Sequence, residues 1–197
     1  MKNKIKLIAL FGKSGAGKDF LFNKILRAYP DMHRVVSSTT RAPRQGEIEG
    51  KDYFFVSDKE FTSTKHYEQS YFNGWWYGTG EKNYNPDMIN IGIFDPKRIE
   101  MLSQQSDIFD IFSIYVETKD KERLIRALGR EVEPNCKEIC RRYLADSEDY
   151  NFINIQFPYY SFDNNNNNNN CSQFANIAKW VSLTKQIDLF IQKDEDD

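Results

Sequence analysis

The sequence is poor in the residues that most metal and redox sites require. Its 197 residues include two histidines and three cysteines. Cys136 and Cys140 lie one helical turn apart, and neither a second cysteine pair nor a neighbouring histidine accompanies them. Structural zinc sites use four such ligands, so this spacing disfavours zinc and favours reduced, unpaired thiols.

The sequence also lacks a charge excess and a long apolar run. Its 27 Lys and Arg residues nearly balance 29 Asp and Glu residues, for a formal net charge of -2. Nucleic-acid binding depends on a basic surface that releases phosphate counterions, so no general nucleic-acid partner is expected. The apolar run Leu7–Phe11 is far too short to span a bilayer. It leads into a glycine-rich loop rather than a signal cleavage site, and we expect a cytoplasmic protein with no membrane partner.

Short apolar runs alternate with segments of helical spacing along most of the chain. Leu7–Phe11 is typical of a strand buried on both faces of a parallel sheet. Phe20–Leu26 then shows helical spacing that ends near Pro30. Further strands are expected at 34–37, 88–94, 109–117 and 152–156, and further helices at 96–103, 120–128, 137–149 and 172–192. This alternation predicts an α/β fold, with a parallel sheet flanked by helices.

The composition changes between residues 37 and 80, where short aromatic segments are separated by glycine and asparagine. Asn73–Gly74 is a strong hairpin signal between two of these segments. A short helix is expected at Asp58–Lys65, with Ser57 or Asp58 as its cap. We predict a small β-rich insert at 37–80.

The rest of the chain, residues 1–36 and 81–197, is expected to form the core. It contains the asparagine run Asn164–Asn170. A uniform polar run cannot pack a hydrophobic core, so we predict a disordered loop at about 161–171.

A glycine-rich segment follows the first predicted strand. It reads Gly12–Lys13–Ser14–Gly15–Ala16–Gly17–Lys18 and fits the first seven positions of the phosphate-binding loop pattern. Its backbone amides can converge on phosphate oxygens, Lys18 adds a mobile positive charge, and the next helix directs its amino end at the anion. The eighth position, usually a magnesium-binding Ser or Thr, is Asp19. Magnesium would be oriented through water by Asp19, or held by nucleotide phosphates and water.

A second anion site is predicted shortly after this loop. Arg41 and Arg44 are separated by a spacer that contains a proline, beside the hydroxyls of Ser37–Thr40 and near Tyr53. Arginine forks match phosphate oxygens through paired donors. Two distinct phosphate sites in one chain indicate two phosphorylated ligands, which is the requirement for a kinase acting on a nucleotide.

Four segments that follow the glycine loop in order resemble the guanylate kinase family, over nearly the whole chain through about Gln156. They are Ser37–Arg44, Gly46–Glu47, Gly50–Val56 and Tyr77–Thr79. The resemblance implies that Arg41, Arg44, Tyr53 and Tyr77 bind the phosphate of a monophosphate acceptor, and that Ser37, Glu68 and Thr79 read its base. Guanine offers two donors to one carboxylate, whereas adenine would leave a buried Glu68 unpaired, at a cost of about 1–3 kcal/mol.

The resemblance also implies a mobile lid at about 127–140, anchored by Asn135 as a helix cap. The lid arginines would offset charge that develops on the phosphoryl group in flight. The catalytic side chains implied in this way are Lys18, Arg126, Arg130 and Arg141. Arg123 and Arg142 are expected on solvated helix faces.

Three features depart from the family pattern. Only Gly80–Asp87 separates the Tyr–Gly–Thr motif from the next strand, where the family has a helix. Asn90 and Gly92 stand where aspartates are expected near the acceptor base, and Asp95 is the nearest carboxylate that can replace them. The segment that contacts adenine after the last strand falls near Gln156.

These observations lead to one main hypothesis and two alternatives. The main hypothesis is an ATP- and Mg²⁺-dependent kinase for GMP or dGMP, active as a monomer or homodimer on small-molecule nucleotides. The first alternative is a kinase for a different (d)NMP, because Asn90 and Gly92 replace the expected aspartates. The second is a non-catalytic guanylate kinase-like binding module, against which the retained glycine loop argues.

Overall fold

The computed structural model describes residues 4–43, 46–72, 74–130, 132–150, 155–165 and 172–193. Helices and strands alternate along much of the chain. In chain order they are β1 (Ile5–Phe11), α1 (Lys18–Ala28), β2 (His33–Arg34), β3 (Ser38–Thr39), β4 (Phe54–Phe55), α2 (Asp58–Ser63), β5 (Glu68–Phe72), β6 (Trp75–Thr79), the 3₁₀ turn η1 (Glu81–Asn83), β7 (Asn90–Ile93), α3 (Pro96–Ser103), β8 (Phe109–Glu117), α4 (Asp120–Leu128), α5 (Cys136–Asp149), β9 (Tyr160–Asp163) and α6 (Ser172–Gln192).

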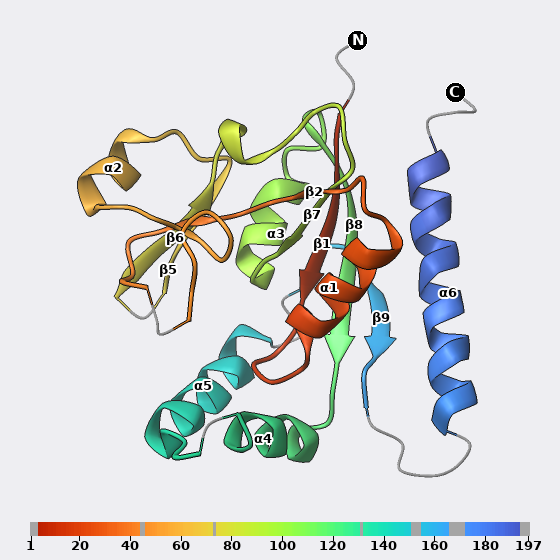
Figure 1. Ribbon diagram of the computed structural model, residues 1–197. Coiled ribbons are helices and arrows are strands. Elements are labelled where there is room, and N and C mark those ends of the chain that lie inside the picture. The colour runs from red at the N-terminus through yellow and green to blue at the C-terminus, as the bar shows by residue number, and fades with distance from the viewer. Residues whose placement is uncertain are drawn as a thin grey trace.

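Five parallel strands form the central sheet in the order β2-β7-β1-β8-β9. Ile8 and Leu10 of β1 point into a core cluster shared with α1 and α6, and Leu7 and Phe11 point into a second cluster shared with α3. Because side chains alternate along a strand, an apolar run such as β1 is buried on both faces. Figure 1 shows α1 and α6 against this sheet and α4 and α5 beyond the end of β8. The predicted α/β fold is confirmed.

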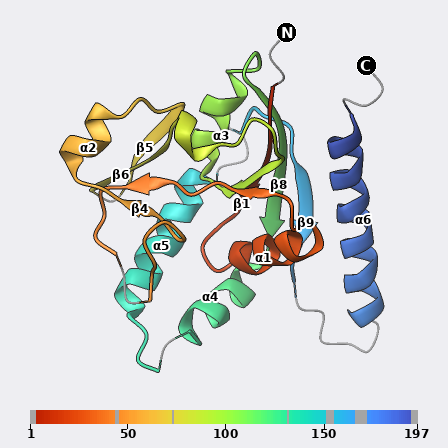
Figure 2. The ribbon, with the colours of Figure 1, turned by 45° about the horizontal axis from the view of Figure 1, so that its top comes forward.

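A second sheet, in the order β4-β3-β6-β5, lies to one side of the central sheet (Figure 2). β5 and β6 pair antiparallel with Phe72 opposite Trp75, so the two strands lie on either side of the predicted hairpin position. Ser57 caps α2, and its side chain and that of Glu60 form a reciprocal capping box. The predicted β-rich insert therefore corresponds to this sheet and α2.

The last strand of the central sheet lies later than the sequence predicted. Residues 151–154 fall outside the described part of the chain, and Ile155 and Gln156 are not in a strand. β9 lies at Tyr160–Asp163 instead, within the first part of the loop expected to be disordered. Phe162 packs into the cluster with α1 and α6, which secures this edge strand.

The carboxyl ends of β1 and β8 meet at one edge of the sheet. The glycine loop follows β1 there, and α4 follows β8. Ligands of open α/β sheets bind outside the carboxyl ends of the strands, so this edge is the place to look for a site. Among the described residues, no helix has the length and apolar character to cross a membrane.

Candidate active site

The glycine loop packs closely against the backbone of α4 and the side chain of Asn164. Gly15 has φ +78°, and a Cβ there would lie 2.7 Å from the Arg123 carbonyl oxygen. Gly17 has φ +91°, and a Cβ there would overlap the Asn164 side chain. Both the left-handed backbone and the close approach require glycine. These contacts hold the loop that the sequence predicted to bind phosphate.

Lys18 begins α1 and turns back over the loop. Its Nζ donates to the carbonyl oxygens of Gly12 at 2.6 Å and Lys13 at 3.2 Å. Burial lowers the pKa of Lys18, while the nearby carboxylates of Asp19 and Asp146 act in the opposite direction. The ammonium group thus lies against the carbonyl oxygens at the start of the glycine loop.

Helix α5 is tied to the glycine loop by a buried network. The Asp146 carboxylate accepts from the Ser14 amide at 3.0 Å and pairs with Arg123, whose Nε donates to the Ser14 carbonyl at 2.8 Å. The Tyr150 hydroxyl donates to the Gly12 carbonyl at 2.8 Å and accepts from its amide at 3.2 Å. The expectation that Arg123 is solvated is wrong: only 2% of its surface is exposed, because it bridges α4, α5 and the loop.

The predicted lid arginines divide into two groups. Arg130 and Arg141 line a large cavity beside the loop. Arg126 instead donates to the carbonyl oxygens of Ala16 at 3.2 Å and Asn164 at 2.8 Å, on the other side of the loop.

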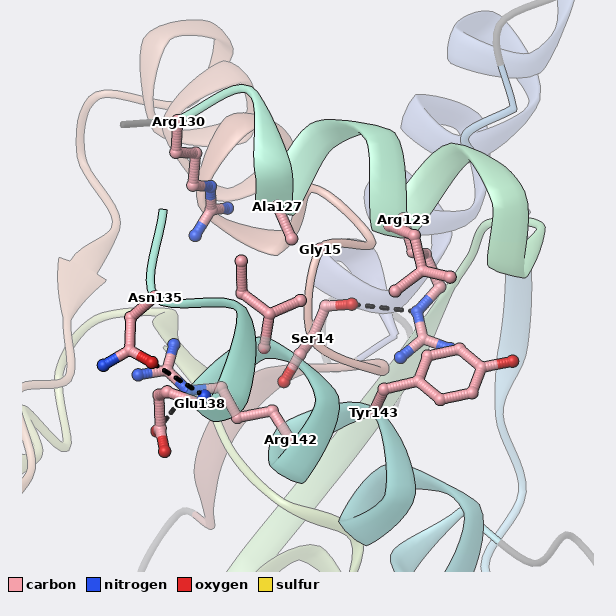
Figure 3. A pocket seen from close by; sticks show the side chains of 11 residues that line it. Ser14, Gly15, Arg123, Ala127, Arg130, Asn135, Glu138, Arg142 and Tyr143 are labelled. Carbon is pink, nitrogen blue, oxygen red and sulfur yellow. Dashed lines mark hydrogen bonds and ion pairs between the residues drawn. The ribbon is translucent and has the colours of Figure 1, made fainter. Parts of the chain in front are cut away.

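Helix α5 is capped by Asn135 as expected. The Asn135 side chain accepts from the Glu138 amide at 3.1 Å. Ion pairs with Arg141 and Arg142 lower the pKa of Glu138 to about 2, so Glu138 stays ionised at neutral pH. Figure 3 shows Arg130, Asn135 and Glu138 around a smaller cavity of about 120 Å³, which is bounded on its far side by Ser14 and Arg123.

The large cavity has a volume of about 370 Å³ and joins the two predicted phosphate sites. One end is lined by Gly12, Gly17 and Lys18, and the other by Tyr53, Tyr77 and Arg98. The rings of Tyr53 and Tyr77 meet edge to face, with centroids 5.9 Å apart. Cavities of this size are typical of small-molecule sites.

The predicted arginine pair lies partly outside the described residues, because Arg44 is not among them. Arg41 is buried and forms a two-bond ion pair with Glu47, at 3.0 and 2.9 Å. Its guanidinium carbon lies 5.4 Å from the centre of the Tyr53 ring. Arg41 Nε is buried without a hydrogen-bond partner in the described part of the chain. Arg41 is thus held beside the tyrosines.

The three predicted base-reading residues come together, but around an arginine. Glu68 Oε1 accepts from Arg98 Nη2 at 2.7 Å, Oε2 accepts from Arg98 Nε, and Thr79 Oγ1 also donates to Oε1. Arg98 Nη2 donates to Ser37 Oγ at 2.8 Å. Glu68 and Thr79 have no exposed surface. Although burial opposes the charge of Arg98, its pairing with Glu68 raises the pKa of Arg98 above its usual range.

Asn90 and Gly92 are structural residues in this fold. Asn90 is fully buried, and its Nδ2 donates to the backbone oxygens of Asn85 and Met88. A Cβ at Gly92 would lie 2.6 Å from the Phe94 ring. Asp95, the predicted substitute carboxylate, caps α3 through the Arg98 amide at 3.0 Å and lines the large cavity.

Comparisons with known proteins agree with this geometry. The family model described as guanylate kinase matches residues 4–179. A guanylate kinase of Trichormus variabilis is 31% identical over 170 residues, which cover 77% of this chain and 83% of that protein. One from Helicobacter pylori is 33% identical over 172 residues, covering 78% and 82%. This chain belongs to the guanylate kinase family.

A solved structure shares the fold of this guanylate kinase family member. The crystal structure of guanylate kinase from Anaplasma phagocytophilum matches with a TM-score of 0.55 at 21% sequence identity, covering 94% of this chain and 89% of that one.

Sequence reasoning missed three residues of this guanylate kinase site. Arg98 and Asp146 carry charges on predicted helices, and such residues are usually exposed; no local pattern marks their buried partners. Asn164 donates from Nδ2 to the Ala16 carbonyl at 2.7 Å, although it is the first residue of the low-complexity asparagine run. The sequence predicts that a residue directly after the last strand contacts the nucleotide, and it places that residue near Gln156. Because β9 ends at Asp163, Asn164 is the residue that follows the last strand.

Proposed function

We propose that this protein transfers a phosphoryl group from ATP to GMP or dGMP, giving ADP and GDP or dGDP. The observation that carries this proposal is the single cavity that joins Lys18 to Tyr53 and Tyr77. A kinase must hold both phosphates in line within one water-poor space. Membership of the guanylate kinase family supports guanine as the acceptor base.

On the donor side, the glycine loop would hold the ATP phosphates through its amides. The residues proposed to bind ATP are Gly12, Lys13, Ser14, Gly15, Ala16, Gly17, Lys18 and Asp19. Lys18, Arg130 and Arg141 would stabilise charge on the transferred group, since all three line the cavity. Arg126 would act from the other side of the loop, where it holds the Ala16 carbonyl.

The residues fit a magnesium ion bound mainly through nucleotide oxygens and water. No group of three or more Asp, Glu, His or Cys side chains is arranged to hold a metal among the described residues. Asp19 lines the cavity next to Lys18 and would orient metal-bound water. When bound, the ion neutralises charge on the phosphates.

On the acceptor side, Tyr53 and Tyr77 would donate hydroxyl hydrogens to the monophosphate, and Arg41 and Arg44 would supply its positive charge. Arg41 Nε is buried with no hydrogen-bond partner among the described residues, which supports this role. The cluster of Ser37, Glu68 and Thr79 would determine which base is accepted. The acceptor phosphate is already ionised, so transfer requires no general base.

The test is a steady-state assay with ATP and Mg²⁺ against GMP, dGMP, AMP, CMP, UMP and dTMP, with diphosphate measured directly. We expect GMP or dGMP to exceed the other acceptors at least about 100-fold in kcat/KM. Lys18→Met should lower kcat/KM by at least about 100-fold, whereas Lys185→Met, at an exposed position on α6, should leave it unchanged. ATP binding without diphosphate formation would show a binding module instead.

A further inference from the structure

Arg98 and Glu68 are arranged so that the arginine, and not the carboxylate, faces the cavity. Arg98 belongs to α3 of the core, Glu68 begins β5 of the insert, and the two form a buried ion pair. Arg98 lines the large cavity, whereas Ser37, Glu68 and Thr79 do not. Glu68 has no exposed surface. A nucleotide in the cavity therefore meets Arg98 before it can meet Glu68.

The hydrogen-bonding capacity of the pair points the same way. Arg98 Nε and Nη2 each donate to one carboxylate oxygen of Glu68. They therefore occupy the two acceptors that N1–H and the 2-amino group of guanine would need in order to bind Glu68 directly. The hydrogen bonds that the Arg98 side chain makes to the described residues all start from Nε and Nη2 and none from Nη1. The guanidinium carbon lies 5.0 Å from the centre of the Phe94 ring. Nη1 thus retains two donors for a ligand.

We propose that Arg98 is the specificity-determining residue of the acceptor base, donating from Nη1 to the 6-oxo oxygen of guanine. Ser37, Glu68 and Thr79 are positioning residues that hold its guanidinium in place. This inference rests on the proposed function, because it assigns the base contact of that same site. Arginine has donors only, so it matches the O6 and N7 acceptors of guanine and is mismatched with the 6-amino group of adenine. The Asp95 carboxylate, on the same cavity wall, supplies an acceptor beside it.

The experiment compares three acceptors that differ in the 2-amino and 6-oxo groups of the base. GMP carries both the 6-oxo and 2-amino groups, and IMP lacks the 2-amino group. 2-Aminopurine riboside monophosphate lacks the 6-oxo group and, with it, the hydrogen on N1. Binding of the fluorescent 2-aminopurine nucleotide is followed directly, and GMP and IMP are measured by its displacement and by turnover.

With Arg98→Met, we expect the affinity for GMP and IMP to fall by the same factor, about 10-fold to 100-fold, while that for the 2-aminopurine nucleotide stays unchanged. Glu68→Gln should weaken GMP and IMP equally, because it acts through Arg98, and should add nothing in the Arg98→Met background. If Arg98→Met leaves the protein unfolded, the double variant Arg98→Met/Glu68→Gln removes both charges and carries the same comparison.

Three results would overturn the inference: unchanged GMP affinity in Arg98→Met, equal weakening of all three nucleotides, or a Glu68→Gln loss of affinity for GMP that persists in the Arg98→Met background. The last result would show that Glu68 itself contacts the base. Wild-type protein that binds GMP but forms no GDP refutes the proposed function, and the binding comparison still decides the role of Arg98.

Discussion

Replacing Arg98 with methionine removes the only charged partner of Glu68 among the described hydrogen bonds and ion pairs. Burial already raises the pKa of Glu68, with the Arg98 guanidinium opposing this shift. Without the guanidinium the pKa rises further, and the variant folds with Glu68 protonated. Removing one partner of a buried pair typically destabilises a protein by about 3–5 kcal/mol.

The sign of the pH dependence follows from proton uptake. A carboxyl group whose pKa is raised on folding is protonated in both the folded and the unfolded state below the unfolded pKa of about 4.3. Above that pH the folded state binds more protons than the unfolded state, so the free energy of unfolding falls as the pH rises. The cost approaches about 1.4 kcal/mol for each pH unit above that value, hence about 1 kcal/mol at pH 5 and nearly 4 kcal/mol at pH 7. The defect of Arg98→Met should therefore grow with pH.

Urea unfolding followed by tryptophan fluorescence at pH 5 and pH 7.5 measures this difference. The double variant Arg98→Met/Glu68→Gln should lose most of the pH dependence, because no ionisable group is left at the site. Lys179→Met breaks the more exposed ion pair with Asp163 and should cost less than about 1 kcal/mol. An equal loss of stability at both pH values in Arg98→Met would refute the reasoning.

Three further predictions concern the glycine loop and the insert. Tyr150→Phe removes both hydrogen bonds to Gly12 and should cost about 1–2 kcal/mol of stability by chemical denaturation; an unchanged midpoint would contradict the role of the hydroxyl. Asn164→Ala removes the bond to the Ala16 carbonyl and should raise the KM for ATP about 5-fold with the KM for GMP unchanged; a change confined to GMP would count against this placement. Ser57→Ala removes the cap of α2 and should lower stability by about 1 kcal/mol without altering kcat/KM, in contrast to Ser63→Ala, which is not a cap.

Local signals were sufficient for most helices. α3, α4 and α6 begin and end where the sequence predicted. For α3 the start is encoded locally, since Asp95 caps the helix and Pro96 occupies its first turn. The edge strand β9 was misplaced because the apolar segment before it and the Tyr160–Phe162 alternation are equally suitable for a strand, and only packing decides between them.

The site was predictable where its residues are close in sequence. The glycine loop, the tyrosines and the position of Glu68 follow from motifs. The pairing of Glu68 with Arg98 joins residues 30 positions apart on different elements, and nothing in either local segment indicates it. Arg123 was misjudged for the same reason, because its partner Asp146 lies on another helix. Buried charge pairs are properties of the assembled fold rather than of local patterns.

The hydrogen bonds of Asn164 bear on how this gene can change. Asn164 contacts the glycine loop, and Asn165 accepts from the Lys119 amide at 2.7 Å. Both are the first members of a run that continues to Asn170. Replication slippage adds or removes repeated codons, but a gain or loss of several codons in this run still leaves asparagine at positions 164 and 165. The repeat therefore preserves these two hydrogen bonds against the kind of mutation that repeats promote.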